Sequence, residues 1–265
     1  MISTEKFIQD CLLVRSQSPL VHNITNYVAM NFAANSLLAV GASPLMSFYA
    51  GEMEEIVGIA SALTVNIGCL DENEMEGMRI AAATADRLHK PWVLDPVGAG
   101  ASTARTQICK ELIGFHPTII RGNASEIACL AGVCVEKSRG VDSSMASDDV
   151  VEAAKALAKA SGSIVSMSGA TDYITDGERV ETLRNGDPIM SKVTVMGCSA
   201  TAVTGAFAAV DSDPFTAALN AMALWGVAGE KAAAVSAGGT GTFAVKFMDA
   251  LSTSDAAADA LLIRQ

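Results

Sequence analysis

The chain has 265 residues, of which 50% are hydrophobic and 18% charged, so it can bury a large core and does not have the composition of a disordered protein. Its formal net charge is -11, and it lacks the cationic footprint that nucleic-acid binding requires. No apolar run approaches the roughly 18 residues of a membrane helix, and the N-terminal segment, with Glu5 and Asp10, has no signal-peptide pattern. We therefore expect a soluble, cytoplasmic protein that binds neither nucleic acid nor membrane.

Helix and strand patterns alternate along the chain, which predicts an α/β fold with a mostly parallel central sheet and helices on both faces. The first half predicts helices over 4–15 (capped by Thr4), 26–38 (stopped by Gly41), 72–89 and 123–132, and strands over 63–67, 92–94 and 118–121. The second half predicts a helix over 147–161, a strand over 164–167, a hairpin of strands 173–175 and 179–183, and helices over 198–210, 214–236 and 242–251. No linker or repeat divides the chain, so we expect a single domain over residues 1–265.

Six cysteines occur in the chain, without a C-x-x-C pair or metal-ligand spacing. This pattern favours reduced thiols, most of them buried. The cysteines are Cys11, Cys69, Cys109, Cys129, Cys134 and Cys198.

Two polar groups follow predicted strands, where ligands of open α/β sheets bind. Asp95 ends a strand before the glycine-containing loop 96–101, so its carboxylate is placed to hold Mg²⁺ or to cap a turn. Arg121 precedes Asn123 and Glu126, which have the spacing of a helix capping box. Arg121 is suited to gripping phosphate, and Glu126 is suited to a metal as well as to the cap.

A third motif, Gly197-Cys198, begins an alanine-rich helix. Free amides at such a helix start bind anions, and a thiol there is expected to have a lowered pKa. The alternative is a small residue that packs the helix start. A fourth motif pairs Asn26, which can hydrogen-bond a small heterocycle, with Met46, which can wall it; ordinary capping and core packing explain both residues equally well.

Other nucleotide and catalytic signatures are absent from the sequence. G-x-G-x-x-G after a first strand and G-x-x-x-x-G-K-[ST] do not occur, which argues against a Rossmann dinucleotide enzyme and a P-loop kinase. His22, His89 and His116 are scattered, so a His-based triad has no support.

Taken together, five segments resemble the hydroxyethylthiazole kinases of thiamine salvage, in that family's order and spacing. They are SPLVHNITNYV (18–28), LLAVGASPLM (37–46), LDPVGAGA (94–101), IRGNASEIACLAG (120–132) and KVTVMGCSATAVTGAF (192–207). The resemblance implies a three-layer ribokinase-like fold and a homotrimer with active sites between subunits. It also implies transfer of phosphate from ATP, with Mg²⁺, to 4-methyl-5-(2-hydroxyethyl)thiazole.

By motif position, the resemblance assigns a role to each site residue. Cys198 stands where related sugar kinases have an aspartate base, so it is the catalytic candidate. The remaining assignments are Asn26, Met46 and Val195 for the thiazole, Arg121, Ser168 and Gly197 for ATP, and Asp95 and Glu126 for the metal.

The chain departs from the family pattern just before Cys198. The family often has Gly-Thr-Gly-Cys or Gly-Ala-Gly-Cys there, whereas this chain has Val195-Met196-Gly197-Cys198, which weakens the role of position 195 and can narrow an anion site. Alternatives are a hydroxymethylpyrimidine or sugar kinase, a non-catalytic nucleotide-binding regulator, and a hydrolase or transferase with Cys198 as nucleophile.

Overall fold

The structure of the chain is a computed structural model that describes residues 2–133 and 147–265. The eight strands of the described residues form one sheet in the order β2-β1-β3-β4-β5-β6-β7-β8. Strands β1 to β6 pair in parallel with their neighbours, and β7 and β8 add an antiparallel hairpin at one edge of the sheet. The strands are β1 Leu20–Ile24, β2 Ser43–Met46, β3 Ala62–Asn66, β4 Trp92–Asp95, β5 Ile119–Asn123, β6 Ile164–Ser168, β7 Asp172–Thr175 and β8 Val180–Leu183. The prediction of a mostly parallel sheet is confirmed.

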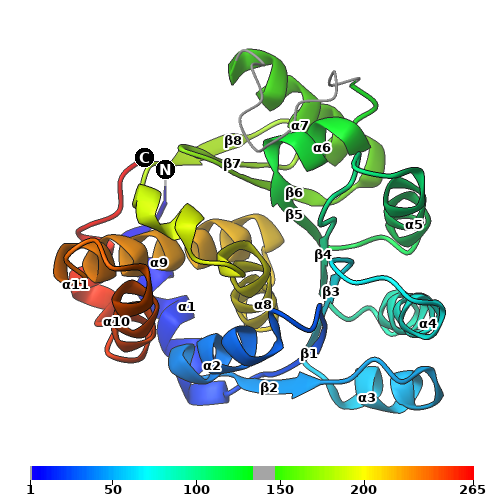
Figure 1. Ribbon diagram of the computed structural model, residues 1–265, viewed down its shortest axis with the longest axis horizontal. Coiled ribbons are helices and arrows are strands. Elements are labelled where there is room, and N and C mark those ends of the chain that lie inside the picture. The colour runs from blue at the N-terminus through cyan, green and yellow to red at the C-terminus, as the bar shows by residue number, and fades with distance from the viewer. Residues whose placement is uncertain (1, 134–146) are drawn as a thin grey trace.

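Helices cover both faces of the sheet and produce three layers (Figure 1). One layer contains α1 Thr4–Gln17, α2 Met30–Val40, α8 Met196–Ala208, α9 Pro214–Val235, α10 Thr240–Ser252 and α11 Ala256–Ala260. The other layer contains α3 Met53–Ile59, α4 Glu72–Arg87, α5 Thr103–Ile113, α6 Ala124–Leu130 and α7 Ser147–Ser161. Each layer has its own cluster of buried apolar side chains against the sheet, which is the expected energetic basis of such a fold.

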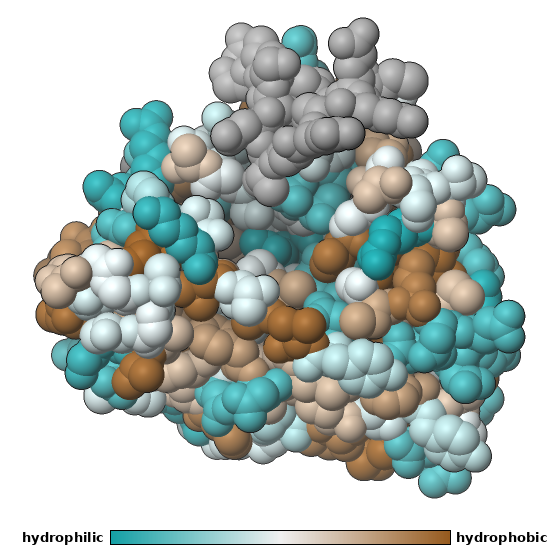
Figure 2. Space-filling view, viewed as in Figure 1, coloured by the Kyte–Doolittle hydropathy of each residue, from teal (hydrophilic) through white to brown (hydrophobic). Residues whose placement is uncertain are grey.

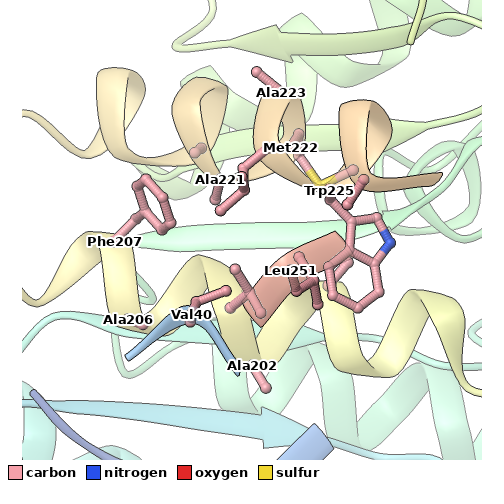
Figure 3. Close-up of a cluster of buried hydrophobic side chains, with 14 of the residues drawn as sticks. Val40, Ala202, Ala206, Phe207, Ala221, Met222, Ala223, Trp225 and Leu251 are labelled. Carbon is pink, nitrogen blue, oxygen red and sulfur yellow. The ribbon is translucent and has the colours of Figure 1, made fainter. Parts of the chain in front are cut away.

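Helix α8 lies close to the sheet because its side chains are small. A Cβ at Gly205 would be 2.6 Å from Thr64 Cγ2, so only glycine permits this approach to β3. Figure 3 shows Phe207 of α8 turned toward α9, Ala202 and Ala206 on the opposite side of α8, and Leu251 beside Trp225. The Thr201 hydroxyl, in the second turn of α8, donates to Asp95 at the end of β4, and this contact holds the start of α8 at the carboxyl edge of the sheet.

The first half of the chain differs most from the prediction. Strands β1 and β2 were not predicted, and neither were α3 and α5. Helix α2 begins at Met30 rather than at 26, because residues 27–29 form a turn in which the Asn26 side chain accepts from the Ala29 amide at 3.0 Å. The cap of α1 is Ser3 rather than Thr4, since the Ser3 oxygen accepts from the backbone of the first turn.

Five of the six cysteines are described, and all five are free thiols. The expectation that most are buried is only partly correct: Cys11 and Cys109 are buried, while Cys69, Cys129 and Cys198 are half-buried, and Cys134 lies outside the described residues. Among the described helices, none has the length and apolarity needed to cross a bilayer. The cytoplasmic location and the single-domain organisation stay predictions.

Candidate active site

The predicted site residues gather where parallel strands end. Asp95 and Asn123 end β4 and β5, Ser168 ends β6, and Asn26 follows β1 by two residues. Figure 2 shows a hollow with hydrophilic residues at its floor, on the part of the molecule where Figure 1 has α8 and α9 facing the β5–β8 side of the sheet. The carboxyl edge is the place where open α/β sheets bind ligands.

Asn26 and Cys198 are neighbours in this site. Asn26 Nδ2 donates to Cys198 Sγ at 3.4 Å and to Asn66 Oδ1 at 3.0 Å. Asn66 Nδ2 in turn donates to Asp95 Oδ2 at 2.6 Å, and the Thr201 hydroxyl donates to the same oxygen at 2.8 Å. A continuous set of polar side chains therefore connects a loop after β1, strands β3 and β4, and helix α8.

The buried Asp95 carboxyl is shifted toward its neutral form. Its pKa is raised to about 6, chiefly by burial and also by the Glu126 charge, against the opposing effects of the Arg121 charge and the hydrogen bonds from Thr201 and Asn66. A carboxyl with this pKa is mainly ionised at neutral pH, although the surroundings make that ionisation costly. Perturbed carboxyls of this kind are typical of functional sites.

The prediction of a lowered pKa for Cys198 is wrong. Burial of the thiol, reinforced by the nearby Asp95 charge, raises its pKa to about 11, against the opposing effects of Asn66, Asn26 and Arg121. The helix start alone predicts a lower value, but desolvation outweighs it here. Cys198 is therefore a neutral thiol near pH 7, which argues against the nucleophilic hydrolase or transferase.

Arg121 lies beside the start of α8. Its side chain is buried, and a Cβ at Gly197 would be 2.9 Å from Arg121 Nη1, so glycine is needed at position 197 for the guanidinium to lie there. No hydrogen-bond partner is recorded for the buried Arg121 Nε within the described part of the chain. Helix α8 starts without a side-chain cap, so its first amides are open beside a cation. A cation and open amides at one point have the chemistry that suits an anion.

Glu126 is confirmed as part of a capping box. The Asn123 side chain accepts from the Glu126 amide at 3.0 Å, and Glu126 Oε2 accepts from the Asn123 amide at 2.9 Å. Its other oxygen accepts from the Gly98 amide at 2.8 Å, so Glu126 also fixes the loop after β4. The Glu126 charge also helps to raise the pKa of Asp95, so the two carboxylates are close enough to interact.

The remaining predicted residues lie around this centre. The Ser168 hydroxyl donates to the Gly122 carbonyl at 3.4 Å, and Met46 is half-buried at the end of β2. Val195 precedes α8 with a left-handed φ of 68°, which is unusual for a β-branched residue. The Met196 side chain belongs to the core cluster beneath, so it leaves the start of α8 open.

Sequence reasoning missed three residues that organise the site. The sequence pattern places Asn66 only in a buried strand and Thr201 only in a helix. Arg105 of α5 donates to the Val97 carbonyl at 2.9 Å, and it also binds the carbonyls of the loop after β3, at Ile67 (2.8 Å) and Gly68 (2.9 Å). The signal available in the sequence was a polar residue, Asn66, near the end of a buried strand and two residues before a glycine. The structure explains this glycine, because a Cβ at Gly68 would lie 2.7 Å from Asn26 Nδ2.

Comparisons with known proteins place the chain in one family. Residues 12–256 match the model of the hydroxyethylthiazole kinase family. A hydroxyethylthiazole kinase of Leptospira biflexa serovar Patoc is 51% identical over 245 residues, which is 92% of this chain and 91% of the relative. The solved structure of the hydroxyethylthiazole kinase protein from Pyrococcus horikoshii superposes with a TM-score of 0.87 and 37% identity, over 95% of this chain and 94% of that one.

The fold is also that of a wider group. A ribokinase-like superfamily protein of Enterococcus faecalis superposes with a TM-score of 0.68 at 13% identity, over 95% of this chain and 93% of that one. This similarity concerns the fold alone and confirms the expected ribokinase-like architecture. With a family match over residues 12–256 and a relative that is 51% identical over 92% of it, the chain belongs to the hydroxyethylthiazole kinase family.

Proposed function

We propose that the chain transfers the γ-phosphoryl group of ATP to the hydroxyethyl group of 4-methyl-5-(2-hydroxyethyl)thiazole, a step of thiamine salvage. The observation that carries this proposal is the contact between Arg121 and Gly197 at the uncapped start of α8. A guanidinium and open amides at one point can stabilise the charge of a phosphoryl group in transfer. Cys198 follows Gly197 directly, so the acceptor hydroxyl is expected between that anion site and Asn26.

The roles of the surrounding residues follow from this arrangement. Asn26, Met46 and Val195 bind the thiazole alcohol, and Arg121, Ser168 and Gly197 bind ATP. Cys198 orients the attacking hydroxyl, because a thiol with a pKa of about 11 stays protonated at neutral pH. A loose phosphoryl-transfer transition state needs little help from a base, so orientation is sufficient.

Asp95 and Glu126 form a donor set that suits Mg²⁺. Both are carboxylates, the hard oxygen ligands that this ion prefers together with water and substrate phosphates. The hydrogen bonds recorded for Asp95 both go to Oδ2, which supports Oδ1 as the oxygen for an ion or its water. When bound, Mg²⁺ would neutralise charge on the ATP phosphates.

We also propose that the protein is a homotrimer with active sites between subunits. Three large side chains near the Asn26 and Met46 end of the site are exposed: Tyr27 by 55%, Val28 by 64% and Tyr49 by 69%. Apolar exposure next to a site supports cover by a second copy of the chain. Light scattering after size-exclusion chromatography tests this proposal, and a monomeric mass contradicts it.

One experiment tests the proposed reaction. The purified protein is mixed with ATP, Mg²⁺ and single alcohols: the thiazole alcohol, a hydroxymethylpyrimidine and several sugars, and ADP release is measured. We expect release with the thiazole alcohol and at most slow release with the others. Preference for another alcohol would contradict the substrate, and ATP binding without transfer to any alcohol would favour the non-catalytic regulator.

A further inference from the structure

Asn66 occupies the middle of the site but has no part in the reaction as proposed above. It ends β3, which lies between β1 and β4, and it is opposite Asp95 in the β3–β4 register. Only 2% of its surface is exposed. A buried amide at this point needs partners for both of its ends, and it therefore links whatever lies on either side.

The orientation of the Asn66 amide is fixed by the backbone. Asn66 Oδ1 accepts from the Gly68 amide at 2.9 Å, so its Nδ2 must be the group that donates to Asp95 Oδ2. The Asn26 amide is fixed in the same way, because Asn26 Oδ1 accepts from the Ala29 amide at 3.0 Å. Since a backbone N–H can only donate, neither side chain can turn over without losing a hydrogen bond.

These contacts close a ring. Cys198 and Thr201 lie one turn apart on α8, and Asn26, Asn66 and Asp95 join them through side-chain hydrogen bonds. Every member except Cys198 is buried. The two amides connect the thiol to the Asp95 carboxylate on one side of the ring, and Thr201 connects α8 to it on the other; Asn66 is the only member that hydrogen-bonds both Asn26 and Asp95 within the described contacts.

A neighbouring pair on the same two strands shows what a purely structural polar contact looks like here. Thr64 is two residues before Asn66 on β3, and its hydroxyl donates to Asn23 Oδ1 at 2.7 Å. Asn23 Nδ2 donates to the Val21 carbonyl at 2.9 Å, so this pair ends on backbone and its recorded contacts do not include Cys198 or Asp95. Thr64 is therefore a matched control for Asn66.

From this geometry we propose that Asn66 is a positioning residue of the phosphoryl transfer. It acts through Asn26, which it holds against the thiol and the alcohol, and through Asp95, whose carboxylate it orients. The inference rests on the proposed alcohol kinase function and adds a specific dependence to it. Loss of the Asn66 amide should disturb alcohol binding and turnover, and leave ATP binding nearly unchanged.

Two variants separate the two contacts. Asn66→Ala removes both, and we expect the KM for the alcohol to rise about tenfold and kcat to fall about tenfold or more, while the KM for ATP changes less than about threefold. Asn66→Asp keeps acceptors for Asn26 and Gly68 but replaces the amide donor to Asp95 with a second buried carboxyl, and two carboxylates this close do not both ionise. It should therefore lower kcat while the KM for the alcohol stays within about threefold of wild type.

A double-mutant cycle tests whether Asn66 acts through Asn26. In the Asn26→Ala background, Asn66→Ala should cause little further rise in the alcohol KM, because the group that it positions is gone. Thr64→Val, made in parallel, is expected to lower the thermal midpoint and to leave both KM values and kcat near wild type. Circular dichroism melting of each variant identifies loss of folding, and if Asn66→Ala does not fold, Asn66→Asp still decides on kcat.

The results separate this inference from the proposed function. If wild type transfers phosphate to an alcohol and the Asn66 variants behave like Thr64→Val, the inference is wrong. It is also wrong if the ATP KM rises as much as the alcohol KM, or if Asn66→Ala is equally harmful without Asn26. If wild type prefers an alcohol other than the thiazole, the proposed substrate fails, and the same cycle run with that alcohol still decides the role of Asn66.

Discussion

Replacing Asp95 with asparagine should stabilise the fold while it damages the reaction. The pKa of Asp95 is raised from 3.8 to about 6, chiefly by burial, so the folded protein holds the proton more tightly than the unfolded chain does. Ionisation of Asp95 therefore lowers the free energy of unfolding. This loss of stability grows as the pH rises from about 4 to about 6, and it is fully present above that range. A shift of about two pKa units corresponds to about 3 kcal/mol.

The gain in free energy of unfolding from Asp95→Asn should depend on pH, and this dependence identifies ionisation of Asp95 as its cause. Relative to wild type, Asp95→Asn should gain up to about 3 kcal/mol near pH 7.5 and about half of that near pH 5, before any constant cost of the new amide is subtracted. Urea denaturation at the two pH values, without ATP or metal, measures the difference. At the same time kcat should fall by about 100-fold, as is common when a preorganised charge is removed from a site.

Asp172→Asn is the matched control for the electrostatic part. Burial also raises the pKa of Asp172 to about 6, but its carboxylate accepts from the Gly169 amide rather than from Asn66 or Thr201. Both variants should show the pH-dependent gain, and only Asp95→Asn should combine it with the full loss of turnover. An Asp95→Asn effect on stability that is the same at both pH values would refute the reasoning.

Three further predictions concern the start of α8 and the loops of the site. Cys198→Ala should slow transfer yet keep the ATP dissociation constant, measured by calorimetry, within about threefold, since the thiol faces Asn26; complete loss of ATP binding contradicts the assignment. Val195→Gly should raise Tm by roughly 2 °C, because the removal of about 1–2 kcal/mol of left-handed backbone strain is partly offset by the greater unfolded-state entropy of glycine. Val195→Ala should raise Tm less, and a lower Tm for Val195→Gly would contradict the prediction. Arg105→Lys should lower the free energy of unfolding, measured by urea denaturation, by about 2 kcal/mol, because an ammonium cannot span the three carbonyls that the guanidinium binds. An unchanged urea midpoint would contradict this prediction.

The sequence predicted those elements whose signals are local. The hairpin around Asp176-Gly177, the helix over 147–161 and the strand before Asp95 each carry turn, periodicity or breaker residues of their own, and all three are present. Strand β1 was missed because His22 and Asn23 interrupt its apolar run. Their burial is explained by distant partners, the Ser47 carbonyl for His22 and the Thr64 hydroxyl for Asn23, which no local pattern reveals.

The same distinction applies to the site. Asp95, Arg121 and Cys198 stand at a strand end or a helix start, so their positions were predictable, and the structure brings them together. Asn66 was not predictable in this way, because its partners Asn26 and Asp95 are 40 and 29 residues away. The pKa of Cys198 was predicted in the wrong direction, since the helix start is a local effect and burial is a tertiary one.

The charge of the chain and the chemistry of its site fit together through Arg121. A protein with a formal net charge of -11 offers no field that attracts a polyanion, so positive charge for ATP has to be local. Arg121 supplies part of it, but its charge already acts on both Asp95 and Asp172. No side chain caps the start of α8, so its open amides stay available to a phosphate. An acidic surface therefore argues against nucleic acid as a partner without arguing against a nucleotide as a substrate.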